Sequence, residues 1–221
     1  MVMTCAAATA QVHTVCVHLK DGKMVELAVS DIDYIDIASH AAVDLGLSVK
    51  WASCNIGAET PEGLGARYAW GETQEKSDYS ERRYAYYKNE QYQYIGVNIS
   101  GTQYDVARKL WGEPWRMPTR QEVAELTGKC EWTAATVGGV KGYRVTGPNG
   151  NSIFLPAAGY QDGTERKEEG TGGFYWSGTL NRDMTSSAYN INFRGYDAEW
   201  SACRAYGFSV RPVTTSMPSS R

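Results

Sequence analysis

Residues 174–213 read FYWSGTLNRDMTSSAYNINFRGYDAEWSACRAYGFSVRPV, and this stretch decides the expected fold. Between positions 189 and 194 apolar and polar side chains alternate strictly. A period of two is typical of a strand with one buried and one free face. The predicted core face holds Tyr189, Ile191 and Phe193. The predicted outward face holds Asn190, Asn192 and Arg194.

The polar residues of this stretch have the composition of a recognition surface. Lys is absent, Glu occurs once, and Tyr, Trp, Arg, Asn, Ser and Gly dominate. Rigid aromatic side chains supply contact area in such surfaces, and small polar groups supply adaptable hydrogen bonds. The alternative is an ordinary solvated strand face with flanking loops. The candidate ligand-binding residues are Gly178, Arg182, Asp183, Asn190, Asn192, Arg194, Tyr196, Asp197, Trp200, Arg204, Tyr206 and Phe208.

A second set of residues in the same stretch is expected to form rigid support for that surface. These scaffold residues are Trp176, Tyr189, Ile191, Phe193, Gly207 and Val210.

The overall composition predicts a folded protein and argues against nucleic acid as its partner. The chain has 221 residues, of which 42% are hydrophobic and 21% charged, with a net charge of -3. Binding of phosphate backbones needs a cationic field, which this chain lacks. No apolar stretch is long enough to span a membrane. The chain holds 7 Trp and 15 Tyr against 4 Phe, a bias that favours amphipathic surfaces.

The N-terminal forty residues predict a processing segment followed by a small β unit. Residues 1–10 are small and apolar, and Ala8-Thr9-Ala10 fits a signal-peptide cleavage site, with an unstructured N-terminus as the alternative. A secreted or cell-surface location is therefore expected. Residues 11–40 contain two alternating segments, 12–19 and 24–29, joined by a turn with Asp21-Gly22, a strong hairpin signal. A short third element is expected at 30–37.

The middle of the chain predicts strands, two short helices and then hairpins. Strands are expected around 47–51 and 67–72, with a long irregular, Tyr-rich loop over 73–99. A helix is expected over 104–110, and a second begins at Thr119, where Thr119 and Glu122 form a capping box. Strands at 129–132, 142–146 and 152–156 follow, joined by Gly-rich turns. Residues 157–173 are expected to form a charged loop.

Several motifs occur in an order that resembles a known family. They are AVDLGLSVKWASCNIGA, YAWGE, SGTQYDVA, WRMPT, KGYRVTGPNGNSIFLPAAGY, YWSGT and GFSVRPV. The chain resembles the major paralogous domain of Bacteroidetes and Fibrobacter, in the formylglycine-generating-enzyme branch of C-type lectin-like proteins. The resemblance implies an α+β C-type lectin fold over 41–213, preceded by the small hairpin unit. The variable ligand-binding region would be 174–213, and 214–221 would be a tail.

The same branch includes the variable proteins of diversity-generating retroelements, in which adenine positions of a C-terminal coding stretch are rewritten. The undiversified domain usually carries many Asn residues in this region. The resemblance implies that the residues found in their place result from diversification: Arg182, Asp183, Arg194, Tyr196, Asp197, Arg204, Tyr206 and Phe208. An Asn codon altered only at adenines cannot give Trp, Met or Glu. Met184, Glu199 and Trp200 therefore need another template codon or a fixed role. The implied partner is a protein or glycan on another cell, phage or host.

Catalytic and metal chemistry finds little support in the residues. No His follows His40, so Ser-His-Asp and Cys-His sites are excluded beyond it. His13 and His18 fall on opposite faces of one strand, and the Cys spacing fits no zinc site. No metal and no cofactor are expected, and the chain is not expected to be an enzyme. The alternatives are a non-diversified structural or adhesive surface protein and a formylglycine-generating-type oxidase acting through Cys203.

Overall fold

The computed structural model describes residues 14–18, 23–28, 40–194 and 200–215. The chain divides into two compact units, Met1–Ala38 and Ser39–Arg221, which are considered separately. In the first unit, β1 (Thr14–His18) pairs antiparallel with β2 (Met24–Ala28). This pairing confirms the predicted hairpin. The element expected at 30–37 lies outside the described residues.

The expectation of an α+β C-type lectin fold is wrong. Strands make up 39% of the structure and helix 11%, and the strands form several small antiparallel sheets. In the described part of the chain the α-helices are α1 (Val106–Trp111) and α2 (Arg120–Lys129), with a 3-10 turn at Glu81–Arg83. The helices stay short because Gly112 ends α1 and Cys130, in an extended conformation, ends α2.

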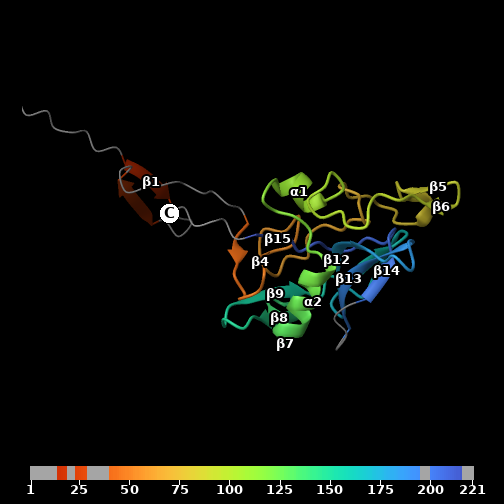
Figure 1. The fold of residues 1–221 in the computed structure, drawn as a ribbon. Coiled ribbons are helices and arrows are strands. Elements are labelled where there is room, and N and C mark those ends of the chain that lie inside the picture. Colours follow the sequence, from red (N-terminus) through yellow and green to blue (C-terminus); the bar gives the residue numbers. More distant parts are fainter. Residues whose placement is uncertain (1–13, 19–22, 29–39, 195–199, 216–221) are drawn as a thin grey trace, which may run out of the picture. The chain divides into compact units, whose positions relative to one another are not determined.

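The central sheet of the second unit has the order β12-β13-β14. Its strands are Gly173–Leu180, Ser187–Phe193 and Trp200–Cys203, all antiparallel. A smaller sheet joins distant parts of the chain, with β15 (Val213–Thr214) and β3 (Ala42–Val43) on either side of β4 (Lys50–Ala52). The end of the unit is therefore tied to its beginning (Figure 1).

The three-stranded sheet β7-β8-β9 confirms the hairpins expected from the Gly-rich turns. Its strands are Glu131–Val137, Val140–Thr146 and Ser152–Pro156. Two short hairpins lie where irregular loops were expected. They are β5–β6 (Tyr87–Lys88 and Gln91–Tyr92) and β10–β11 (Tyr160–Asp162 and Glu165–Lys167). The segment 67–72, predicted as a strand, makes only an isolated bridge from Tyr68 to Phe208.

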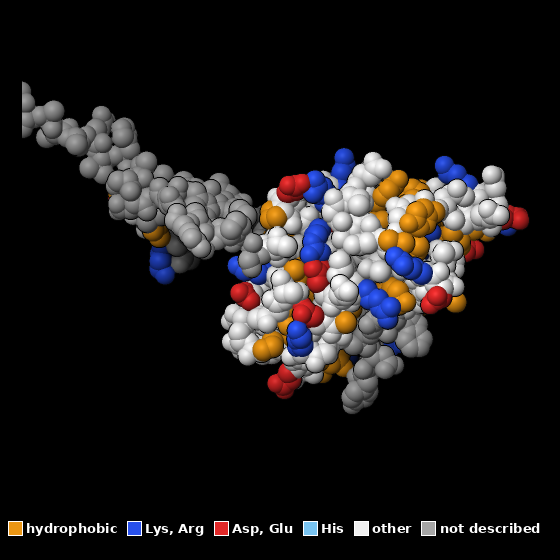
Figure 2. All heavy atoms as spheres, viewed as in Figure 1, with side chains coloured by type: hydrophobic (Ala, Val, Ile, Leu, Met, Phe, Trp, Pro, Cys, Tyr) orange, Lys and Arg blue, Asp and Glu red, His pale blue; other side chains and the backbone are white. Residues whose placement is uncertain are grey.

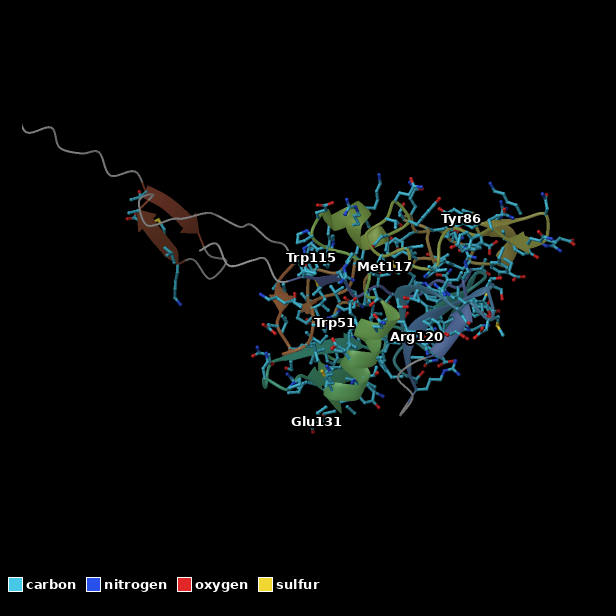
Figure 3. The ribbon with its side chains drawn as sticks, in the orientation of Figure 1. Trp51, Tyr86, Trp115, Met117, Arg120 and Glu131 are labelled. Atoms are coloured by element: carbon cyan, nitrogen blue, oxygen red, sulfur yellow. The ribbon has the colours of Figure 1, made fainter. Side chains whose placement is uncertain are left out.

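Both helices begin at side-chain caps. Asp105 precedes α1 and accepts hydrogen bonds from the backbone of Ala107 and Arg108. Thr119 and Glu122 form the predicted capping box at α2. Such caps satisfy backbone N–H groups that the first helical turn leaves without partners. The helix α2 packs against β12 and β13, and Figure 3 labels Arg120 at its start.

The central sheet is covered on both faces. Ile191, Phe193 and Tyr175 pack into one core cluster, together with Val123 and Leu126 of α2. The opposite face packs into a second cluster, which includes Phe174, Trp176, Ala188, Phe208 and Val210. The predicted core face is thus confirmed at Ile191 and Phe193.

The prediction of a free opposite face is wrong at Asn190. Its side chain is fully buried: it lies opposite Trp176 of β12, on the face where Trp176 packs with Phe208 and Val210 of the C-terminal segment. Asn192 is half-buried and Arg194 is exposed, so the face opens only toward the end of the strand. Tyr189, expected in the core, is half-buried instead. A period of two divides a strand into two faces but does not say which of them other elements cover.

Two buried or half-buried arginines, Arg116 and Arg211, connect segments of the scaffold. Arg211 is fully buried and donates to the carbonyl oxygens of Ala52, Ser53 and Phe154 and to Asn55 Oδ1, over 2.8 to 3.1 Å. Burial lowers the pKa of Arg211 to about 10, which still leaves it charged near neutral pH. Arg116 binds the Glu122 carboxylate through both terminal nitrogens.

The outer surface carries charges of both signs. Figure 2 shows basic and acidic side chains interspersed on the face in view. Among the described residues, no helix has both the length and the apolar character needed to cross a membrane.

Candidate ligand-binding cleft

The structure separates the predicted site residues by exposure. Arg182, Asp183 and Arg194 are exposed, whereas Asn192 and Tyr206 are half-buried. Four others are buried: Gly178, Asn190, Arg204 and Phe208. Tyr196 and Asp197 lie outside the described residues. Trp200 begins β14 opposite Asn190, and its side chain is also outside the described set.

Four of the predicted residues meet in one cleft of about 290 Å³, here called the aromatic cleft. Its lining residues are Tyr160, Phe174, Asn192, Arg194, Ser201, Ala202, Tyr206 and Phe208. They come from β10, β12, β13, β14 and the C-terminal segment. Small-molecule sites commonly combine aromatic walls with a few well-placed polar groups, which is the arrangement found here.

Tyr160 is a cleft residue that the sequence does not predict, because residues 157–173 were expected to form a loop. The backbone of its neighbours fixes its place: Gly159 N donates to Gly172 O over 2.8 Å, and Gln161 and Gly207 exchange two hydrogen bonds of 2.9 Å. Gly159 has a φ of +64°, and a Cβ there would lie 2.3 Å from Lys167 O, so only glycine fits. The dipeptide Asp162-Gly163 is a hairpin signal that could have revealed β10 and β11.

The cleft wall is a continuous aromatic cluster. Phe208 stacks on Trp176 with ring centres 4.2 Å apart, and Phe174 lies 5.3 Å from Phe208. Tyr160 contacts Phe174 and Tyr206 at 4.7 and 5.7 Å. Because Phe174 and Phe208 are buried, the half-exposed rings of Tyr160 and Tyr206 form the accessible part of the wall.

Charged side chains at the rim occur in pairs. Arg194 lies 5.2 Å from the centre of the Phe174 ring and forms an ion pair with Glu168 at 2.5 Å. Lys167 pairs with Asp162 at 2.6 Å on the neighbouring hairpin. Burial, followed by the negative charge of Asp162, raises the pKa of Tyr206. Its hydroxyl therefore stays protonated at neutral pH and can both donate and accept.

A second, larger groove of about 480 Å³ lies at the start of α2. Arg182 and Asp183 line it with Arg120, Tyr189 and Asn98. The guanidinium of Arg120 stacks 3.9 Å from the centre of the Tyr189 ring. Tyr189 is thus covered on one ring face by Arg120 and lines the groove with the rest of its side chain. The predicted residues are thus divided between two openings and do not form one face.

Arg204 does not belong to a presented surface. Only 1% of it is exposed, and its guanidinium donates to Tyr84 Oη, Thr185 O and Gln93 O over 3.0 to 3.1 Å. It also lies 4.8 Å from the centre of the Trp70 ring. The assignment of Arg204 to ligand contact is therefore corrected: the side chain connects three loops.

No described feature resembles a metal site or a reactive thiol pair. No group of three or more His, Cys, Asp or Glu able to hold a metal occurs in the described ranges. Cys16, Cys54, Cys130 and Cys203 are free thiols. Burial raises the pKa of Cys203, whose sulfur lies 3.0 Å from Tyr92 Oη. A raised pKa disfavours the thiolate, the nucleophilic form.

No protein-family model, curated protein or solved structure matches this chain.

Proposed function

We propose that this chain is a ligand-binding protein of the receptor or adhesin type, and that the aromatic cleft is its principal binding site. The ligand is a protein or a glycan on another cell, phage or host. The observation that carries this proposal is the convergence of Asn192, Arg194 and Tyr206 on one open, aromatic-walled cleft. Clefts with these side chains supply contact area and directed hydrogen bonds together.

The buried frame behind the cleft supports the same proposal. The buried side chains of Trp176, Phe174 and Phe208 pack behind the cleft wall. Substitutions at exposed rim residues therefore leave the packing of the core intact. A retroelement-diversified surface would use this tolerance at exposed Arg182, Asp183 and Arg194. It would exclude the buried Asn190 and Arg204, and replacing Arg204 would remove the donor to Tyr84 Oη, Thr185 O and Gln93 O.

A secreted or cell-surface location belongs to this proposal and is supported by Ala8-Thr9-Ala10 at the N-terminus. Fractionating the native host into medium, membrane and cytosol, with immunodetection of the chain, tests it. Recovery in the cytosol alone would contradict the proposed location.

An array of glycans and surface proteins, probed with the full chain, tests the binding function. Tyr206→Ala and Asn192→Ala should lose the signal, and Arg144→Ala, a charged residue away from the cleft, should retain it. A specific signal that survives both cleft changes would place the site elsewhere.

The gene neighbourhood separates a diversified receptor from an ordinary surface paralogue. A reverse transcriptase gene beside a near-copy of codons 174–213 is expected for the former. Absence of both, with binding retained, would leave a non-diversified adhesive protein.

A further inference from the structure

We propose that the aromatic cleft recognises a neutral sugar residue at the end or along the side of a glycan. This inference rests on the proposed function and names the ligand class of the same site. Three properties of the cleft carry it: its size, the pairing of donors with acceptors on its rim, and the balance of its charges.

The size of the cleft fits one or two sugar rings. Its volume of about 290 Å³ lies just below the usual size of ligand pockets, roughly 300 to 1,000 Å³. A pyranose ring has a face of C–H groups that suits the apolar surface of an aromatic ring. The half-exposed rings of Tyr160 and Tyr206 offer such surfaces, and their contact with buried Phe174 and Phe208 keeps them in place.

The rim provides donors next to acceptors, which is what sugar hydroxyls require. Each hydroxyl can donate one hydrogen bond and accept others. The Asn192 amide carries both functions, as do the hydroxyls of Ser201 and Tyr206. Arg194 beside Glu168 adds a guanidinium and a carboxylate within one ion pair. A polyol can therefore satisfy its hydroxyls here without leaving a buried polar group unpaired.

Among the residues that the structure describes, the charged side chains at the rim are paired before any ligand arrives. Arg194 is paired with Glu168, and Lys167 is paired with Asp162. A ligand carboxylate or phosphate at Arg194 would have to displace the Glu168 carboxylate, so it would exchange one ion pair for another. A neutral ligand leaves both pairs intact. This balance favours a neutral sugar over an acidic one.

A protein partner is the competing ligand class. Stable protein interfaces bury roughly 1,200 to 2,000 Å² in total, so such a partner would need surface well beyond the cleft. Its affinity would then depend on many residues outside the aromatic wall.

The test is titration of the full chain with neutral sugars, namely glucose, galactose, mannose and N-acetylglucosamine with their disaccharides, and with glucuronic and galacturonic acid. Calorimetry and saturation-transfer NMR detect binding. At least one neutral sugar should bind, with an affinity unchanged between about 50 mM and about 500 mM salt, because screening acts on charges. Tyr206→Ala should weaken it by about tenfold or more, and Tyr206→Phe, which keeps the ring, by less.

Circular dichroism and urea unfolding verify that the variants fold. Asn192→Ala replaces Tyr206→Ala if the latter unfolds, with the same expected loss. Binding of the uronic acids alone, weakened by salt, would overturn the neutral class and leave the proposed function standing. If the chain bound a protein but no sugar, and Tyr206→Ala abolished that binding, the sugar inference would be overturned and the proposed function would stand. Sugar binding unaffected by both cleft variants would overturn the inference and the site of the proposed function together.

Discussion

Arg204 Nε donates a hydrogen bond to the hydroxyl oxygen of Tyr84 over 3.1 Å, although 120 positions separate the two residues. The same guanidinium donates to carbonyl oxygens in two further loops, those of Gln93 and Thr185. A planar fork of five N–H donors can satisfy acceptors in several directions at once. Arg204 thus fixes the Tyr-rich segment against the end of the central sheet.

Arg204→Lys should destabilise the second unit by about 2 to 4 kcal/mol, because an ammonium group cannot reach all three acceptors and hydrogen bonds to charged groups contribute about 1.5 to 3 kcal/mol each. Urea unfolding followed by circular dichroism measures the change. Arg182→Lys, on an exposed side chain, is the matched control and should stay within about 0.5 kcal/mol of the wild type. Equal stability of the two variants would contradict the structural role of Arg204.

Thr119→Ala should cost about 1 kcal/mol, because it removes the hydroxyl that accepts from Glu122 N at the start of α2. Thr119→Ser retains the hydroxyl and should recover most of the loss. Thermal unfolding of the three proteins provides the comparison. A Thr119→Ser variant as unstable as Thr119→Ala would show that the methyl group, and not the cap, matters.

The Glu125 carboxylate makes the stability of the fold depend on acid pH. Hydrogen bonds from Lys129 and then from Ser48 lower its pKa to about 2, against roughly 4.3 in an unfolded chain. The unfolded state therefore binds more protons in this range. The stabilisation is present above about pH 5 and is lost as the pH falls toward 2.

Glu125→Gln should flatten this part of the pH profile, measured as the urea midpoint between about pH 2 and 6. Glu131→Gln, on an exposed side chain beyond α2, is the control and should leave the profile close to that of the wild type. An unchanged slope in Glu125→Gln would show that other carboxylates cause the acid loss.

Gly173→Ala should destabilise the fold by about 1 to 3 kcal/mol, the usual cost of overpacking. A Cβ at this position would lie 2.0 Å from the Phe193 ring, which Trp132 and Tyr143 contact from other directions. Gly128→Ala is the control, because a Cβ there meets nothing within 4 Å and the residue is helical. It should stabilise the chain by up to about 1 kcal/mol.

The two glycine variants are compared by urea unfolding. A double change, Gly173→Ala with Phe193→Leu, should cost less than the sum of the single changes, because the smaller side chain removes the clash. Additive costs would indicate that Gly173 matters for a reason other than contact with Phe193.

Local patterns in the chain were sufficient to predict several elements. The capping box at Thr119, the hairpins of β7, β8 and β9 and the inward direction of Ile191 and Phe193 follow from residues within a few positions of each other. Turn residues and side-chain period act over this short range, so one sequence is enough to identify them.

Tertiary structure alone decided which faces are covered and which residues meet. Asn190 and Arg204 are buried because segments far away in the chain pack over them, and no local pattern records such coverage. The fold class was wrong because local patterns identify single elements but not how they assemble: most sheets join strands that follow one another, and β15 pairs with β4 from the other end of the unit. Tyr160 joins Asn192 and Tyr206 in one cleft only because Gln161 pairs with Gly207. Whether distant backbone groups pair depends on the free energy of the whole folded chain. It therefore cannot be predicted from the sequence of one segment.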